Sequence, residues 1–194
     1  AWHDLYQVTI STGQRTLLRK NTERISDWVF DEAAKLRLAT RTADNGDTDV
    51  LRVDDAGFTK VYWCNVFESC RTIRFHKDGA RVYMVTNKGD VDLMRLTLFD
   101  PATGKEEAVE SDPLKKVDFG NAIFSEVSDE LVATSYNDER TRYYFRDKAV
   151  EADFRLMEKK LPGRDLALAS RTNDDQLWLV SSRSDTEPDE RYLF

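Results

Sequence analysis

Short stretches of alternating apolar and polar residues recur along this chain, and residues typical of turns close each of them. The clearest stretch is RVYMV at positions 81–85, which has the period of two expected of a β-strand. Around it the pattern predicts four strands, at residues 70–76, 81–88, 91–100 and 106–112. The connections between these strands contain residues that favour turns: Lys-Asp-Gly at 77–79, Asn-Lys-Gly-Asp at 87–90 and Asp-Pro-Ala-Thr-Gly at 100–104.

The whole pattern repeats about every 43–50 residues. One marker is the first apolar strand of each unit. It occurs at Trp28, Phe75, Phe124 and Ala169, and these positions are 47, 49 and 45 residues apart. A second marker is a polar residue followed by a short apolar strand. It occurs at Leu5, Val50, Leu93, Tyr143 and Tyr192, and these positions are 45, 43, 50 and 49 residues apart. Two independent markers with one period, and four short strands per period, are typical of β-propeller blades.

The phase of this repeat predicts an all-β fold, a single partial β-propeller built from four-stranded antiparallel blades over residues 1–194. We expect a half blade at 1–20, whole blades at about 22–66, 69–112 and 118–161, and a truncated blade at 165–194. Two segments also contain helix-forming residues. We interpret 31–38 as a hairpin, and 151–161 as a fourth strand that could instead be helical.

An unclosed propeller exposes strand edges, which predicts either self-association through these open blade edges or an incomplete functional unit. The chain starts at Ala1 with no Met or signal peptide, and it stops at Phe194 inside an apolar alternation. We therefore interpret both ends as boundaries within a longer chain.

Composition narrows the class of protein. With 40% hydrophobic and 34% charged residues, the chain suits a soluble globular protein and not a disordered one. Its net charge of −7 argues against a nucleic-acid partner, because phosphate binding needs a basic face. No apolar run is long enough to span a membrane, so we expect no membrane partner.

Cys64 and Cys70 lie six residues apart. They could form a disulfide between the end of one strand and the start of the next, or remain two free thiols that fill apolar space. The spacing leaves both alternatives open, because it does not define the geometry that a disulfide needs.

We expect no catalytic, cofactor-binding or metal-binding residues in this chain. The serine of an α/β-hydrolase lies on a Gly-x-Ser-x-Gly turn, and none of the eight glycines begins such a motif. Of the two histidines, His3 is at the terminus and His76 is on a repeat turn, where we interpret it as a variable turn residue. An α/β-hydrolase domain is thus absent from residues 1–194.

Two acidic stretches, 44–49 and 185–190, are alternatives for a calcium site, because oxygen-rich loops can hold this ion. Neither follows the residue order of a calcium-binding loop, so we interpret both as solvated loops. Zinc is disfavoured by the lack of paired histidines and of a Cys-x-x-Cys motif. For the same reasons we do not favour a propeller enzyme that acts through a metal in its channel.

Aromatic and basic side chains offer two further candidates. Three aromatic residues could line a substrate channel, although aromatic residues at strand centres are usually core: Tyr143, Tyr144 and Trp178. Arg140 and Arg142 could bind a peptide carboxylate. We favour their pairing with Asp138 or Glu139 at the surface.

Three stretches of the sequence resemble known propellers. FHKDGARVYMV at 75–85 resembles the W-S-P-D-G-K-x-I-x-F repeat of TolB-like and peptidase propellers, and DLYQVTISTG at 4–13 resembles their D-L-Y-x-x-x-x-x-T-G strand and turn. SRSDTEPDERYLF at 182–194 resembles the S-D-x-x-P-x-x-Y-Y-L-Y-D loop and strand of acylaminoacyl-peptidase-like and dipeptidyl-peptidase-like members of the prolyl oligopeptidase family of serine peptidases.

This resemblance implies a non-catalytic propeller fragment that gates the access of short peptides to a C-terminal α/β-hydrolase domain outside this chain. The implied partners are that domain and the peptide substrate. The alternative is a TolB-like propeller that acts as a protein-binding module. Relatives of the peptidases occur in cytoplasm and periplasm, and a disulfide between the two cysteines would favour the periplasm.

Overall fold

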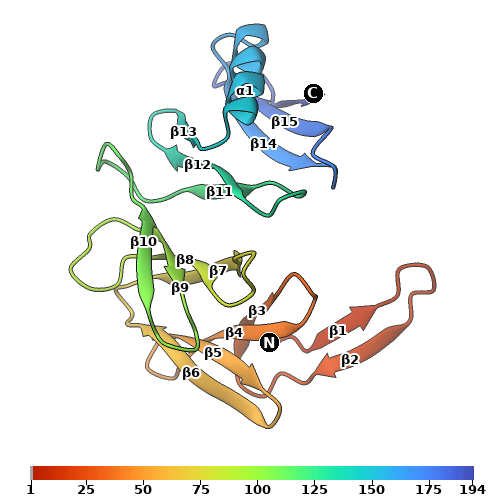
Figure 1. Cartoon of the computed structure of the whole chain (residues 1–194), viewed down its shortest axis with the longest axis vertical. Helices are drawn as coiled ribbons and strands as arrows, with labels where there is room; N and C mark the ends of the chain where they lie inside the picture. Colours follow the sequence, from red (N-terminus) through yellow and green to blue (C-terminus); the bar gives the residue numbers. More distant parts are fainter. Residues whose placement is uncertain (1) are drawn as a thin grey trace. The chain divides into compact units, whose positions relative to one another are not determined.

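A computed structural model describes residues 2–194. They divide into two compact units, and the boundary in the sequence lies between residues 111 and 112. The first unit contains three antiparallel sheets (Figure 1). The first sheet has two strands, β1 (Leu5–Val8) and β2 (Arg15–Arg19). The second has four strands, β3 (Ile25–Phe30), β4 (Leu36–Thr42), β5 (Thr48–Asp54) and β6 (Gly57–Cys64), and so has the third, β7 (Cys70–Phe75), β8 (Val82–Thr86), β9 (Arg95–Phe99) and β10 (Glu106–Glu110). In the four-stranded sheets, strands that follow one another in sequence pair with one another. This meander is the strand order of a propeller blade.

Tight turns join the strands. In the turn between β7 and β8, the Asp78 carboxylate accepts hydrogen bonds from the backbone N–H groups of Ala80 and Arg81, at 2.9 and 3.0 Å. Gly79 has φ +67°, a left-handed conformation that costs glycine little because it lacks a Cβ. The Asp-Gly pair at 78–79 is therefore what allows the hairpin to close at this position.

The core of the first unit lies between its two four-stranded sheets. Val29, Leu38 and Val50 from one sheet pack in one cluster with Phe75 and Phe99 from the other. Burying a side chain of this size stabilises the folded state by about 1.5–3 kcal/mol relative to leaving it in water. β3 and β7, the first strands of the two sheets, are also neighbours in space.

Cys64 at the end of β6 and Cys70 at the start of β7 form a disulfide, with their Cα atoms 6.0 Å apart. The bond links the last strand of one sheet to the first strand of the next, and both cysteines belong to the buried core. Of the two alternatives that the sequence left open, the structure has the bonded pair.

The second unit contains two three-stranded antiparallel sheets and one helix. The first sheet is formed by β11 (Asn121–Phe124), β12 (Leu131–Asn137) and β13 (Thr141–Phe145), and the helix α1 (Lys148–Lys160) follows it. The second sheet is formed by β14 (Asp165–Arg171), β15 (Trp178–Arg183) and β16 (Glu190–Leu193). Its core gathers Phe154 and Met157 from the helix with Leu166, Trp178 and Val180 from the last sheet. Each unit thus has a hydrophobic core of its own.

The interpretation of residues 151–161 as a fourth strand is wrong, and the helical alternative applies. Asp147 caps α1 by accepting hydrogen bonds from the N–H groups of Ala149 and Val150, at 2.8 and 3.1 Å. Phe154 and Met157, three residues apart, lie on one buried side of the helix. The sheet of β11, β12 and β13 therefore has three strands and is followed by a helix. Residues 31–38, by contrast, belong to the predicted hairpin: 31–35 form the turn between β3 and β4, and 36–38 begin β4.

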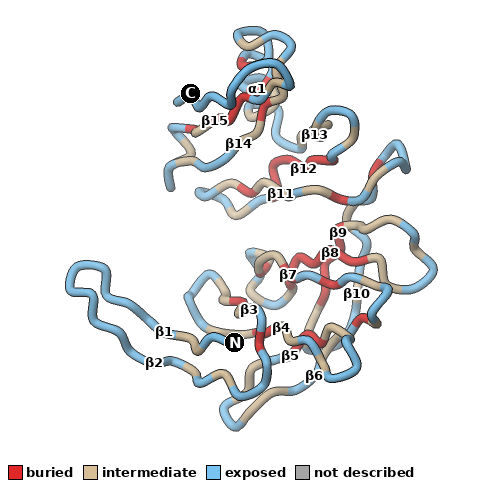
Figure 2. The backbone as a smooth tube through the Cα atoms, turned by 180° about the vertical axis from the view of Figure 1, so that it is seen from behind, coloured by how far each residue is buried: buried red, intermediate tan, exposed pale blue. Residues whose placement is uncertain are grey.

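The predicted all-β fold class is confirmed, and the sheets are consistent with a partial propeller that is not a closed barrel. The positions of the first marker fall on β3, β7, β11 and β14, the first strands of the four larger sheets. The strand predicted at 91–100 is shorter in the structure, where β9 begins at Arg95, because residues 91–94 belong to the preceding loop. Burial is concentrated on the central strands, whereas β1 and β2 are mostly exposed (Figure 2). No helix in the described part of the chain is long and apolar enough to cross a membrane.

Candidate functional site

A polar cleft of about 400 Å³ opens beside the loop that joins β4 to β5. Residues 22–24, residues of the β4–β5 hairpin and Lys60 line it. The lining contains cations and carboxylates, and it contains no histidine or cysteine. The cleft can therefore offer hydrogen bonds and charge to a polar ligand.

The buried charge of the cleft is Asp49, whose side chain is 2% exposed. Its Oδ2 accepts a hydrogen bond from Arg41 Nε at 3.0 Å, and Lys60 Nζ lies 3.0 Å from its Oδ1. Arg41 also reaches Glu23 at 3.0 Å. A buried carboxylate is tolerated when cations surround it in this way. These contacts hold the β4–β5 hairpin to the segment that precedes β3.

The acidic loop at 44–49 does not bring its carboxylates together around one point. Asp44 pairs with Arg24, and Asp47 accepts a hydrogen bond from the side-chain amide of Asn45 at 2.8 Å. Within residues 2–194, no group of three or more histidine, cysteine, aspartate or glutamate side chains is arranged to hold a metal ion. The contacts are those of a solvated hairpin loop.

The second acidic stretch, 185–190, is tied to basic side chains. Arg164 pairs with Glu187, and its Nη2 lies 3.6 Å from Glu190. Arg183 lies 3.5 Å from Asp189. These carboxylates compensate arginine charges at the edge of the last sheet.

His76 takes part in the turn between β7 and β8. Its Nδ1 lies 2.9 Å from Asp78 Oδ2 and accepts a hydrogen bond from the Asp78 N–H at 3.2 Å. Partial burial alone would raise the pKa of the Asp78 carboxyl, but the hydrogen bonds from Arg81 and Ala80 outweigh it and hold this pKa below its usual range. The contacts of His76 are thus local contacts within a hairpin turn.

The three aromatic candidates lie in or beside the core. Tyr143 packs on Phe154 with ring centroids 4.6 Å apart, and its hydroxyl donates to the Leu166 carbonyl at 3.0 Å. Burial, together with the charge of Asp165, raises the pKa of Tyr143 to about 12. Trp178 is buried in the same cluster. Tyr144 instead packs edge-on against Tyr136, with centroids 5.6 Å apart.

Arg142 pairs with Asp138 as predicted, but its main partner is a residue that was not predicted. Two of its nitrogens form a bidentate pair with Asp112, at 2.8 and 2.9 Å, and the Asp112 side chain is fully inaccessible to solvent. The predicted partner, Asp138, lies 3.3 Å from Arg142 Nε as a secondary contact. Arg140 lies in the turn between β12 and β13 and is exposed. The hydrogen bonds from Arg142 hold the pKa of Asp112 well below its usual range.

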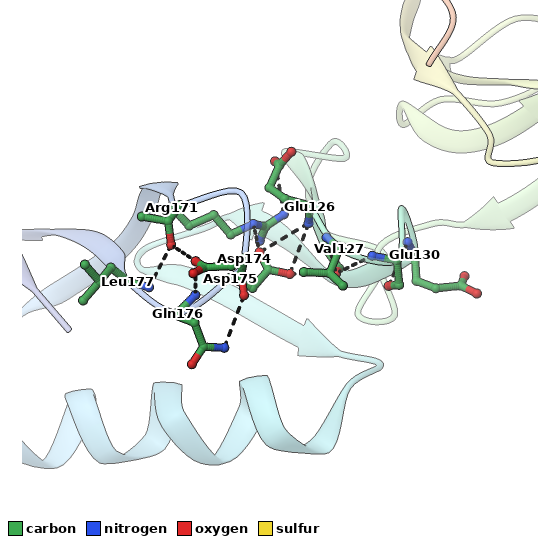
Figure 3. Close-up of polar contacts among 11 residues, drawn as sticks. Glu126, Val127, Glu130, Arg171, Asp174, Asp175, Gln176 and Leu177 are labelled. Carbon is green, nitrogen blue, oxygen red and sulfur yellow. Dashed lines mark hydrogen bonds and ion pairs between the residues drawn. The ribbon is translucent and has the colours of Figure 1, made fainter. Parts of the chain in front are cut away.

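One group of polar contacts was not predicted from the sequence: it joins the β11–β12 turn to the β14–β15 turn (Figure 3). Asp175 accepts hydrogen bonds from the Ser125 hydroxyl at 2.7 Å and from the Glu126 N–H at 3.2 Å. Arg171, whose side chain is 7% exposed, pairs with Asp175 and with Glu126 and lies over the Trp178 ring.

The first unit contains a matching contact, in which Arg74 on β7 pairs with Glu32 in the β3–β4 turn. In both units, an arginine near the end of a sheet's first strand pairs with a glutamate two residues after a phenylalanine, Phe30 or Phe124. The recurrence of Phe-x-Glu with a distant arginine is the signal that could have revealed these contacts.

Comparison with known proteins links the chain to a peptidase. No family model matches the sequence. The chain is 31% identical over 183 residues to dipeptidyl aminopeptidase BIII of Pseudoxanthomonas mexicana. The match covers 93% of this chain and 26% of that protein, so the chain spans about a quarter of the length of the relative it matches.

Proposed function

Because this chain belongs to the prolyl oligopeptidase family, we propose that it is part of a non-catalytic β-propeller in a peptidase. The observation that carries the proposal is the row of meandering antiparallel sheets, two of which pack face to face around one core. Such sheets are suited to building a rigid wall. The similarity to a dipeptidyl aminopeptidase supports the same assignment.

On this proposal, the blades restrict access, so that short peptides reach a hydrolase domain elsewhere in the protein and longer chains do not. That domain and the peptide substrate are the partners. A wall of this kind must stay closed, and the disulfide and the inter-sheet arginine contacts supply links between adjacent sheets within each unit.

The assignment is tested with a fluorophosphonate probe, which labels active serine hydrolases, and with chromogenic dipeptide substrates. We expect the 194-residue chain to remain unlabelled and inactive, and the natural protein that contains it to be labelled and active. Labelling of the isolated chain, or a natural reading frame with no Gly-x-Ser-x-Gly motif, would contradict the proposal.

Gating is tested in the whole peptidase with Phe75→Ala. Phe75 is 1% exposed between the two sheets of the first unit, so its truncation loosens their packing. We expect the rate of cleavage of longer peptides to rise relative to that of a dipeptide substrate. The matched control is Phe67→Ala, because Phe67 is 91% exposed and contributes nothing to this core.

An unchanged ratio between long and short substrates in Phe75→Ala, with the fold intact by circular dichroism, would argue against gating. Phe75→Leu provides a milder variant if the alanine variant does not fold. Capture of a specific protein partner that is insensitive to serine-directed inhibitors would instead favour the TolB-like binding module.

A further inference from the structure

The residue that ends the first strand of each larger sheet is a phenylalanine in three sheets and an arginine in the last. β3, β7 and β11 end in Phe30, Phe75 and Phe124, whereas β14 ends in Arg171. Phe75 is 1% exposed and packs in the core between its own sheet and the preceding one. At the corresponding position of the last sheet, a charged side chain takes the place of an apolar one.

Arg171 is nevertheless buried, because acidic and aromatic groups surround it (Figure 3). Its Nε lies 2.5 Å from Asp175, its Nη2 lies 3.5 Å from Glu126, and its guanidinium lies 4.8 Å from the centre of the Trp178 ring. Asp175 also accepts the hydrogen bond from Ser125 that ties the two turns together. We call Arg171, Asp175, Glu126 and Ser125 the Arg171 cluster. A buried charge of this kind is stable only while its counter-charges stay in place.

The two sheets of the second unit share little apolar contact with each other. The buried side chains of this core come from α1, β14 and β15, and the sheet of β11–β13 adds partly buried ones, Ile123, Tyr143 and Phe145. In the first unit, both sheets contribute buried side chains to one core, and a disulfide joins them. β3 and β7 also have more contact than β11 and β14, the corresponding strands of the described second unit.

Two further contacts between the sheets of the second unit are hydrogen bonds. The Thr141 hydroxyl donates to the Asp165 carboxylate at 3.0 Å, and the Tyr143 hydroxyl donates to the Leu166 carbonyl at 3.0 Å. A hydrogen bond that breaks is replaced by one to water, whereas exposure of apolar surface is not compensated. The interface between these two sheets therefore costs less to open than the interface in the first unit.

We propose that the interface between the sheet of β11–β13 and the sheet of β14–β16 is where the wall opens to admit peptides, and that the Arg171 cluster keeps it closed. This inference rests on the proposed function and adds the place of entry to it. Phe154 of α1 packs on Tyr143 and in the core of the last sheet, so the helix holds one side of the interface together. β11 and β14 separate on the other side when Arg171 leaves its carboxylates.

A cysteine reporter, Leu166→Cys, measures this opening in the 194-residue chain. Leu166 is 3% exposed on β14, and the two native cysteines are bonded, so a thiol reagent reacts only when the interface opens or the chain unfolds. Asp175→Asn should raise the rate of this reaction about tenfold, which corresponds to about 1.4 kcal/mol. Asparagine tolerates the left-handed φ of +57° at position 175, so the substitution removes the charge and keeps the turn.

The matched control is Glu32→Gln, which removes the carboxylate that pairs with Arg74 in the first unit. Its reporter is Val50→Cys, because Val50 is inaccessible to solvent in the core between the two sheets. The apolar core and the disulfide remain in this variant, so the rate should stay within about twofold. Urea separates opening from unfolding: reaction through the open interface rises weakly with urea, whereas reaction through global unfolding rises steeply, because more surface becomes exposed.

A second variant reverses the effect. Arg171→Phe, added to Asp175→Asn, gives β14 the residue that ends β3, β7 and β11 and removes both charges. The reporter at position 166 should then react no faster than in the unaltered background, because apolar contact replaces the ion pair. If Asp175→Asn acted only by weakening the fold, the second substitution would accelerate the reaction further.

The same variants test entry in the whole peptidase. Asp175→Asn should raise the rate of cleavage of long peptides relative to that of a dipeptide substrate, Arg171→Phe should reverse this rise, and Glu32→Gln should leave the ratio unchanged. An unchanged reporter rate in Asp175→Asn, or an equal rise in Glu32→Gln, would overturn the proposal. A faster reporter reaction without a change in the peptide ratio would also overturn it, since the interface would open without being the entrance. The reporter needs no peptidase activity, so its result stands apart from the test of the proposed function.

Discussion

At the scale of single residues, the buried carboxylates Asp112 and Asp49 are held by ion pairs and hydrogen bonds. Asp112 pairs with Arg142. Its carboxylate also accepts hydrogen bonds from backbone N–H groups of its own loop, at 3.1 Å from Leu114 and at 2.9 Å from Lys116. Asp49 is held between Arg41 and Lys60. Removing one member of such a set leaves the other charge and several N–H groups without a partner.

Asp112→Asn should therefore destabilise the chain, by about 2–3 kcal/mol in the free energy of unfolding, measured by urea denaturation. Asp138→Asn is the matched control. Asp138 contacts the same guanidinium at 3.3 Å but is 22% exposed, so its loss should cost less than about 1 kcal/mol. Equal effects of the two variants would show that burial of Asp112 does not matter.

The same carboxyl gives a pH dependence. The pKa of Asp112 is lowered in the folded state, so its stabilising contribution is complete above its unfolded pKa, about 3.9, and is lost as the pH falls below that value. We expect the free energy of unfolding of the unaltered chain to fall more steeply below about pH 4 than that of Asp112→Asn. Parallel curves for the two proteins would contradict this assignment.

At the scale of elements, α1 depends on local signals at its ends as well as on its buried side. Asp147 caps its first turn, Glu151 lies in that turn, and Lys159 and Lys160 lie in the last turn. These charges complement the helix dipole. Phe154 and Met157 then anchor the helix in the core of the second unit.

Asp147→Ala should lower the free energy of unfolding by about 1 kcal/mol, because two N–H groups lose their acceptor. Asp153→Ala makes the same chemical change at an exposed position inside the helix, and its effect should stay within about 0.5 kcal/mol. Thermal or urea denaturation followed by circular dichroism measures both variants.

The disulfide between Cys64 and Cys70 acts on two elements together, since it joins β6 to β7. Alkylation under denaturing conditions should label neither cysteine before reduction and both afterwards, which intact mass measures. Closing a loop of this length limits the unfolded chain, so reduction should lower stability by about 2 kcal/mol. Two labelled thiols without reductant would contradict a bonded pair.

At the scale of the whole molecule, the chain consists of two compact units, each with a hydrophobic core. Phe75 is buried in the first core and Phe154 in the second. A core that is complete within one unit makes the stability of that unit depend mainly on its own side chains.

Phe75→Ala should therefore accelerate amide hydrogen exchange mainly in β3–β10, and Phe154→Ala mainly in β11–β16. Each substitution should cost about 3–5 kcal/mol of local stability. Hydrogen exchange followed by mass spectrometry resolves the two regions. Equal acceleration throughout the chain by either variant would mean that the two units unfold as one.

The order and class of the strands were determined by the sequence itself. Alternation at positions such as 81–85 and turn residues such as Asp78 and Gly79 act locally, so they predict strands without knowledge of the tertiary fold. The period of the first marker then placed the first strand of every larger sheet. The resemblance at 182–194 indicated the family.

Only the tertiary structure decided features that depend on contacts between distant residues. Residues 148–160 are helical because Asp147 caps them and Phe154 meets a core formed by β14 and β15. Arg142 pairs with Asp112 and not chiefly with Asp138, because the loop 30 residues earlier brings a buried carboxylate to it. Sequence pattern reports local periodicity, whereas the partner of a charge or an apolar face is selected by the packing of segments far apart in the chain.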